Sequence, residues 1–139
     1  MNRKKNNRGA VAVILANDKI TLEQNSMACQ LVLKGSSSVG WSFYDEVNGG
    51  YLYAASSSGN YLKTQSTLDD DGRADIRFEA NIATITFKGT NKRNVMQYNP
   101  NNGSPLFACY GSESQKPLQL FKKVESIGNQ VAAPVFCTG

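Results

Sequence analysis

The feature that most constrains the fold of this chain is a series of short apolar runs with two-residue alternation. In the run 74–79, Ile76 and Phe78 point to one side of an extended chain, whereas Asp75 and Arg77 point to the other. Runs of this kind, spaced about 10 residues apart, are typical of half-buried antiparallel strands in a β-sandwich or β-barrel, and they exclude a βαβ fold. The expected strands are 10–15, 28–34, 41–45, 51–55, 60–64, 74–79, 83–88, 94–98, 105–110 and 117–123.

Turn residues fill the intervals between these runs. Gly, Asn, Asp and Ser gather at 48–50, 56–60, 69–72, 89–93 and 99–104, which are typical positions for tight connections between antiparallel strands. The segment 21–30 contains helix-forming residues, but it is short and Asn25-Ser26 interrupts it. We therefore interpret it as a connection between strands.

A weak internal repeat refines the fold class. WSF followed by GGYLYAASSSGNYLKT resembles ITF followed by KRNVMQYNPNNGSPLFACY, and Phe43 and Phe87 are 44 residues apart. The run ending at Phe121 resembles the opening of a third unit. Repeats of about 40 residues with four strands each favour a closed antiparallel barrel of the β-trefoil type, with an incomplete first repeat. Another β-barrel or a β-sandwich remains the alternative.

The chain length suits one globular domain with flanking segments. We expect a basic N-terminal segment at 1–8, a single β domain at 9–124, and a linker at 125–139. The linker loses alternation, and VAAPVFCTG resembles the first strand of a following Ig-like domain that is missing. No apolar run approaches the roughly 18 residues that a membrane span requires.

The net charge gives little support for a nucleic-acid surface. The chain carries 15 Lys and Arg against 11 Asp and Glu, and four of the basic residues lie within the first eight positions. The remainder is neutral, so the basic balance comes from the N-terminal segment. Nucleic acid is therefore the least favoured partner.

The cysteines do not predict a metal site. Cys29, Cys109 and Cys137 show no CxxC spacing, and the chain has no His. Cys29 and Cys109 lie within apolar runs, where a thiol commonly acts as a small buried apolar side chain. A disulfide between Cys29 and Cys109 is the alternative.

Most enzyme chemistry is excluded by composition. Without His, the chain lacks the commonest general base, and a Ser–His–Asp or Cys–His arrangement is impossible. No GxxxxGK[ST] or GxGxxG motif is present, and the acidic residues lie mostly in turns and on polar faces. We expect a protein that is not an enzyme and has no cofactor.

One acidic cluster deserves comparison with calcium sites. Asp69, Asp71 and Asp75 surround Gly72 in a turn-like segment, and Ca²⁺ binds several oxygen ligands from such loops. The segment lacks the DxDxDG spacing and the distal Glu of an EF-hand. An ordinary acidic turn is favoured, with these three residues as a weak Ca²⁺ candidate.

The tyrosine-rich strands supply the candidate binding residues. They flank Ser-, Asn- and Gly-rich loops, where an exposed ring and a nearby amide would suit a sugar. The alternative is that the rings, like that of Trp41, fill the core. The candidates are Tyr53, Asn60, Tyr61, Tyr98 and Asn102.

Two long segments resemble a poorly characterised β-rich accessory module. They are GGYLYAASSSGNYLKTQ at 49–65 and TNKRNVMQYNPNNGSPLFACYGSESQKPLQLFKK at 90–123, preceded by Asn6-Asn7-Arg8. The module occurs in secreted and surface proteins of Gram-negative gut anaerobes, often beside endonuclease/exonuclease/phosphatase-like, protease or Ig-like domains. The resemblance covers about 6–123 and implies an extracytoplasmic location, but it supplies no catalytic residues. Relatives usually carry another hairpin before the NNR segment.

Three functions follow as hypotheses. The first is a non-catalytic module of a larger secreted or surface bacterial protein, which holds glycan or cell-surface material near its neighbouring domains. The second is a structural spacer without a ligand. The third is weak nucleic-acid contact through Lys63, Lys88, Lys92 and Arg93, with affinity falling steeply as salt rises.

Overall fold

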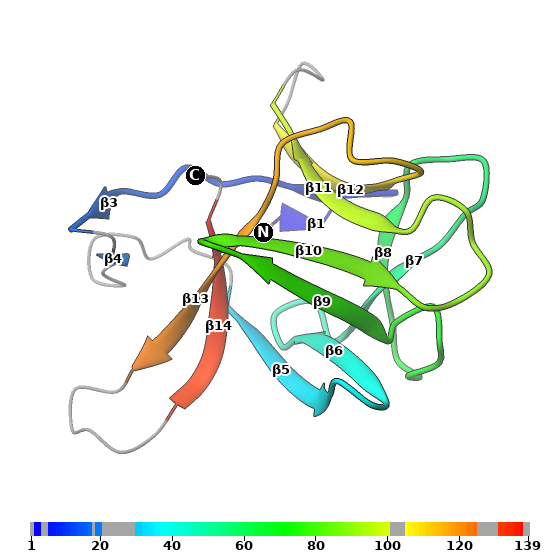
Figure 1. Ribbon diagram of the computed structural model, residues 1–139, viewed down its shortest axis with the longest axis horizontal. Coiled ribbons are helices and arrows are strands. Elements are labelled where there is room, and N and C mark those ends of the chain that lie inside the picture. The colour runs from blue at the N-terminus through cyan, green and yellow to red at the C-terminus, as the bar shows by residue number, and fades with distance from the viewer. Residues whose placement is uncertain are drawn as a thin grey trace.

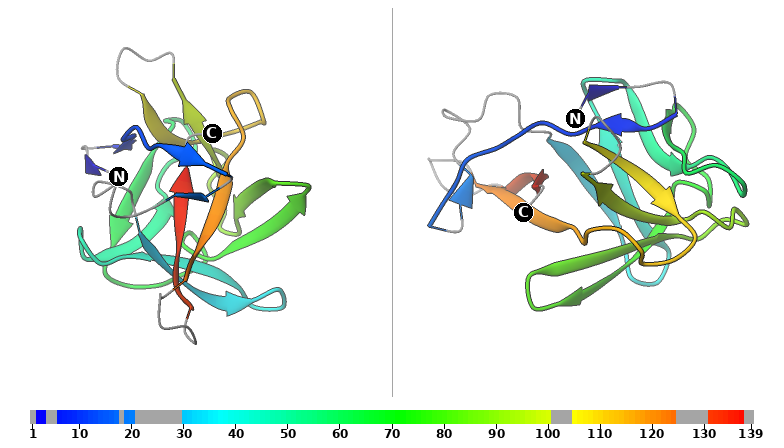
Figure 2. Two further views of the ribbon diagram at one scale, coloured as in Figure 1. Left: turned by 90° about the vertical axis from the view of Figure 1, so that its left-hand side faces the viewer. Right: turned by 90° about the horizontal axis from the view of Figure 1, so that it is seen from above.

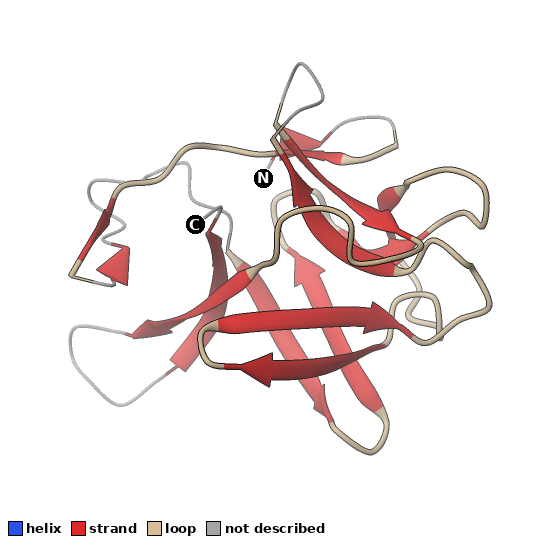
Figure 3. Ribbon diagram, turned by 45° about the horizontal axis from the view of Figure 1, so that its top comes forward, coloured by secondary structure: helices blue, strands red, loops and turns tan. Residues whose placement is uncertain are grey.

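The protein is built of β-strands throughout the residues that its structure, a computed structural model, describes: 2–3, 6–17, 19–20, 30–100, 105–124 and 131–137. Figure 1 shows the strands and Figure 3 shows that no helix occurs among these residues. The described residues form fourteen strands: β1 (Asn2–Arg3), β2 (Arg8–Gly9), β3 (Leu15–Ala16), β4 (Lys19–Ile20), β5 (Leu31–Ser36), β6 (Gly40–Asp45), β7 (Gly50–Ala54), β8 (Leu62–Gln65), β9 (Ala74–Glu79), β10 (Ile82–Phe87), β11 (Val95–Asn99), β12 (Leu106–Tyr110), β13 (Gln119–Val124) and β14 (Val131–Cys137).

One large antiparallel sheet contains ten of these strands. Its order is β1-β2-β12-β11-β10-β9-β6-β7-β8, and β5 pairs with β6 beside this path. The pairs β3–β4 and β13–β14 form separate two-stranded sheets. The sheet curls into a nearly closed barrel-like form, which the three views together make visible (Figures 1 and 2). The expectation of an all-β antiparallel barrel is thereby confirmed at this level.

The N-terminal segment lies between β12 and β8 of the large sheet. The amide of Leu62 donates to the carbonyl oxygen of Asn6 at 2.9 Å, and β2 pairs with β12 through Phe107↔Arg8 and Leu106↔Gly9. The segment therefore connects β8 to β12. This contact removes the exposed edge that each of these two strands would otherwise present.

Arg8 belongs to this junction and not to a basic tail. Its side chain is only 1% exposed. Its Nη2 donates to Oγ1 of Thr64 at 2.7 Å, and its Nη1 donates to the carbonyl oxygen of Asn7 at 2.7 Å. The expected boundary between residues 8 and 9 thus falls within strand β2. The run 10–15 also differs from expectation, because only its last residue, Leu15, lies in a strand.

The C-terminal part of the chain continues the barrel-like arrangement. The amide of Ala83 in β10 donates to the carbonyl oxygen of Leu118 at 2.8 Å, so the segment entering β13 lies beside β10. Strand β13 pairs with β14, and β14 lies beside β5 (Figure 2). Within 125–139, the segment expected to be a linker and the start of a following domain, residues 131–137 form a strand paired with β13. That 125–139 leads into a further domain stays a prediction.

Alternation along the strands builds the core. Phe43 and Phe87, the two residues that mark the internal repeat, are both buried and belong to one cluster with Leu52, Leu62 and Ile85. Trp41, which was expected to fill the core with Phe43, is half-buried.

No helix of the described residues is long and apolar enough to cross a membrane.

Cys109 is a fully buried free thiol within this core, and its burial raises its pKa well above the usual range. Cys29, its possible disulfide partner, lies outside the described residues. The expected strand connection at 21–30 also lies outside them, except for Gln30.

Candidate functional site

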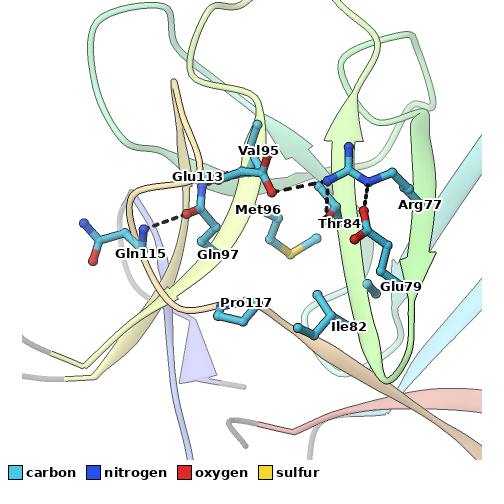
Figure 4. A pocket seen from close by; sticks show the side chains of 11 residues that line it. Arg77, Glu79, Ile82, Thr84, Val95, Met96, Gln97, Glu113, Gln115 and Pro117 are labelled. Carbon is cyan, nitrogen blue, oxygen red and sulfur yellow. Dashed lines mark hydrogen bonds and ion pairs between the residues drawn. The ribbon is translucent and has the colours of Figure 1, made fainter.

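A cleft of about 290 Å³ opens on the outer face of the β9–β10 hairpin, against β11 and the segment 113–117. We call it the Arg77 cleft (Figure 4). Its polar side chains are supplied by Arg77, Glu79, Thr84, Gln97, Glu113 and Gln115. Its apolar part is lined by Ile82, Ala83, Val95, Met96 and Pro117.

The strand register places the polar groups of the hairpin together. Arg77 pairs with Thr84 and Glu79 pairs with Ile82, and residues directly opposite each other in an antiparallel pair share one face. This is the polar face that the alternation in 74–79 predicts. The neighbouring pair, Phe78 with Ala83, directs its side chains to the opposite face, although Ala83 also borders the cleft.

Arg77 holds the two carboxylates of the cleft. Its Nε lies 3.0 Å from Oε1 of Glu79, and its Nη2 lies 3.4 Å from Oε1 of Glu113. The same Nη2 donates to Oγ1 of Thr84 at 3.4 Å. These side chains are exposed, so each ion pair contributes only about 0–1 kcal/mol to stability. One cation and two anions leave the group with a net negative charge.

Gln97 fixes the opposite wall of the cleft. Its side chain is 3% exposed, its Nε2 donates to the carbonyl oxygen of Ser112 at 2.8 Å, and its Oε1 accepts from the amide of Gln115 at 2.8 Å. Tyr98 and Lys116 exchange backbone hydrogen bonds of 3.1 and 2.9 Å. These bonds hold the segment that carries Glu113 against β11, so the wall is preorganised.

The cleft offers one combination of chemical groups. N–H donors of Arg77 lie beside carboxylate acceptors, and an apolar surface that includes Ile82 and Pro117 lies below them (Figure 4). Such a surface fits a ligand with an apolar face and an edge of hydroxyl groups, each of which both donates and accepts.

The four candidates that the structure describes, Tyr53, Asn60, Tyr61 and Tyr98, are not among the residues that line this cleft. Tyr98 packs against Phe107 with ring centroids 5.5 Å apart, and Tyr53 lies half-buried in β7. The ring of Tyr61 lies directly against Gly59. A Cβ added to that glycine would be only 2.6 Å from the ring. The rings therefore act at least partly as packing groups, which was the alternative interpretation.

Amide groups of the two loops beside these tyrosines form hydrogen bonds within the protein. Asn60 accepts from Nη1 of Arg93 at 2.8 Å, and Asn91 donates to the carbonyl oxygen of Ala54 at 2.8 Å. The amide of Lys92 donates to Oγ of Ser57 at 3.1 Å. These bonds join the loop 55–61 to the loop 89–94. Asn102, the remaining candidate, lies outside the described residues.

The acidic turn is organised by hydrogen bonds of its own. Oδ1 of Asp69 accepts from Nε2 of Gln65 at 2.8 Å and from the amide of Asp71 at 3.1 Å. Asp75, the third residue of the weak Ca²⁺ candidate, lies in β9 with its Oδ1 4.0 Å from Nζ of Lys88. Within the part of the chain that the structure describes, no three Asp, Glu, Cys or His side chains gather closely enough to hold a metal ion.

Sequence patterns could have indicated only part of the Arg77 cleft. Arg77 and Glu79 share the predicted polar face of one strand, but polar faces are usually only solvated. Glu113 is separated from Arg77 by 36 positions and lies in no recognisable motif. Gln97 is a buried residue of β11, and the sequence predicts this strand only from the apolar residues beside Gln97.

Comparison of the chain with protein-family models, with curated proteins and with solved structures finds no match. The ligand class is therefore inferred from the geometry of the described residues.

Proposed function

We propose that this chain is a non-catalytic accessory module of a larger secreted or surface bacterial protein, and that it binds neutral glycan in the Arg77 cleft. The observation that carries the glycan part is the cluster of Arg77, Glu79 and Glu113 above an apolar surface. The extracytoplasmic location and the neighbouring domains as partners are supported by the resemblance of 49–65 and 90–123.

The charge of the cleft favours an uncharged ligand. Two carboxylates against one guanidinium repel phosphate, sulfate and nucleic acid at close range. Sugar hydroxyls carry no charge, and a pair of adjacent hydroxyls can accept from Arg77 while donating to a carboxylate oxygen. The same groups that exclude anions therefore suit a glycan.

Binding without catalysis is supported by the chemistry of the same groups. The chain has no His, and both carboxylates of the cleft contact one guanidinium. Glycoside hydrolysis requires two carboxyl groups that flank the bond to be broken, with one of them acting as an acid. Carboxylates clustered on one arginine serve recognition instead.

For the fold we propose a β-trefoil. The hairpins β5–β6, β9–β10 and β13–β14 begin at Leu31, Ala74 and Gln119, which are 43 and 45 residues apart. Strand β6 contacts β9 through Trp41↔Ala74, β10 contacts the segment entering β13, and β14 lies beside β5. These contacts support a ring of three equivalent hairpins, which is the arrangement of a trefoil barrel.

A spacer without a ligand is the second candidate function. It is favoured by the ion pairs of Arg77, because they link the β9–β10 hairpin to the segment 113–117 without any ligand. In this case the cluster is part of the surface of the fold. The two candidates differ in whether removal of Arg77 changes any binding.

A panel of immobilised neutral glycans, with calorimetric titration of the positive members, tests the proposal. We expect saturable binding that Arg77→Ala weakens at least tenfold. Arg73→Ala is the matched control, because Arg73 is paired with Asp70 at 3.2 Å outside the cleft, and it should bind as the unaltered chain does. No binding to any neutral glycan would favour the spacer. Binding to nucleic acid that falls steeply with salt would favour the third function.

A further inference from the structure

We infer that a second binding site for a neutral sugar ring lies on the opposite side of the β9–β10 hairpin from the Arg77 cleft. A cleft of about 300 Å³ opens there, and we call it the Phe78 cleft. Phe78 and the β9–β10 turn form one side, and β13 and Leu15 form the other. The inference shares a ligand class with the proposed function, but the two clefts have no residue in common.

The exposure of Phe78 is the first observation. Alternation places it on the inward face of β9 with Ile76, yet 62% of its surface is accessible. A large apolar side chain left in water forfeits the stabilisation that its burial would give. Phe121 of β13 lines the same cleft, so two aromatic rings adjoin one open space.

The polar groups of the Phe78 cleft are the second observation. They come from Asn81 at the turn and Gln119 at the start of β13, and both carry primary amides that donate and accept hydrogen bonds. None of the described residues that line the cleft carries a charge. An uncharged site disfavours charged ligands, which would lose their hydration without gaining a partner.

Together these groups match the surface of a pyranose. One face of a pyranose ring presents C–H groups, which pack against an aromatic ring such as Phe78, while its edge presents hydroxyl groups to amides. Leu15 and Leu120 extend the apolar surface beside the rings. A peptide or lipid segment would use the apolar surface but would gain less from the two amides at its border.

The test is an NMR titration of the ¹⁵N-labelled chain with the methyl glycosides of glucose, galactose, mannose and N-acetylglucosamine, up to 100 mM each. At least one glycoside should shift the side-chain amide signals of Asn81 and Gln119 in a saturable manner. Phe78→Ala should weaken this binding at least tenfold, and Phe78→Trp should retain it. Arg77→Ala should leave it unchanged, which separates this site from the Arg77 cleft.

Three results would overturn the inference. One is the absence of a saturable shift with all four glycosides, whatever the Arg77 cleft binds. Another is a shift that is the same in Phe78→Ala as in the unaltered chain. The third is binding that Asn81→Ala, at the exposed turn, leaves unchanged; this variant also decides the matter if Phe78→Ala unfolds.

Discussion

The side chain of Asp71 occupies the space that a Cβ on Gly89 would need. That Cβ would overlap Oδ1 of Asp71 and would lie 2.9 Å from its Cγ and 3.1 Å from its Cα. We expect Gly89→Ala to lower the free energy of unfolding by about 1–3 kcal/mol, the usual range for overpacking. Urea denaturation measures the change. Gly111→Ala is the control, since its nearest neighbour would be 3.5 Å away, and Asp71→Ala should restore most of the loss caused by Gly89→Ala.

Asp71 also makes stability depend on pH. Burial, followed by the neighbouring charges of Asp69 and Asp70, raises the pKa of Asp71 above its ordinary value of 3.8. Protonation therefore favours the folded state, and this contribution is complete below pH 3.8 and lost as the pH rises through the raised pKa. Because Asn resembles the protonated acid, Asp71→Asn should raise the melting temperature at pH 7. A gain of the same size at pH 3 would contradict this account.

Phe87 tests the assignment of the core. It is 1% exposed, and its removal should leave a cavity among the buried residues of the large sheet. Phe87→Ala is expected to cost about 3–5 kcal/mol in chemical denaturation. Val47→Ala is the matched control, because Val47 is 89% exposed and its loss should change stability by less than about 0.5 kcal/mol. A cost below about 1 kcal/mol for Phe87→Ala would place its side chain outside the core.

The turn between β9 and β10 contains a strained residue. Ala80 has a φ of 52°, in the left-handed region that costs a non-glycine residue about 1–2 kcal/mol. Ala80→Gly should stabilise the protein by about 0.5–1 kcal/mol after allowance for the greater freedom of glycine in the unfolded chain. The melting temperature reports the change. Ala55→Gly, at a position without positive φ, should instead lower it, and a loss in both variants would refute strain at Ala80.

Deletion of 125–139 tests whether this segment contributes a strand to the barrel or is a linker. Deleting it removes β14, the partner of β13 and neighbour of β5, and so exposes two strand edges. We expect a large fall in the melting temperature or loss of the folded state. Replacing only 125–130 with a Gly-Ser segment of equal length keeps β14 and should be tolerated. If the deletion shifts the melting temperature by only a few degrees, the linker predicted from the sequence is correct.

The residues show why the fold was more predictable than the site. Alternation around Phe87 depends on neighbours within one strand, so the strand and its inward face follow from the sequence. The position of Phe78 illustrates the limit: its face was predicted correctly, but 62% of its surface is exposed, and exposure depends on which other segments cover that face.

Arg8 and Glu113 show the same limit more strongly. Their partners, Thr64 and Arg77, lie 56 and 36 positions away, and no local pattern announces either contact. Loop composition points to the candidate tyrosines, but it does not show which loop borders a cleft.

The junction at Arg8 has a consequence for the order of assembly during refolding. Hairpins such as β9–β10 join residues that are close in sequence, so their loops close at little entropic cost, whereas the contact of Arg8 with Thr64 spans 56 positions. The junction should therefore form after the rate-limiting step of folding, once the hairpins have packed together. Substitutions at Arg8 would then accelerate unfolding and leave the refolding rate almost unchanged. The junction would therefore lengthen the lifetime of the folded state without speeding its formation.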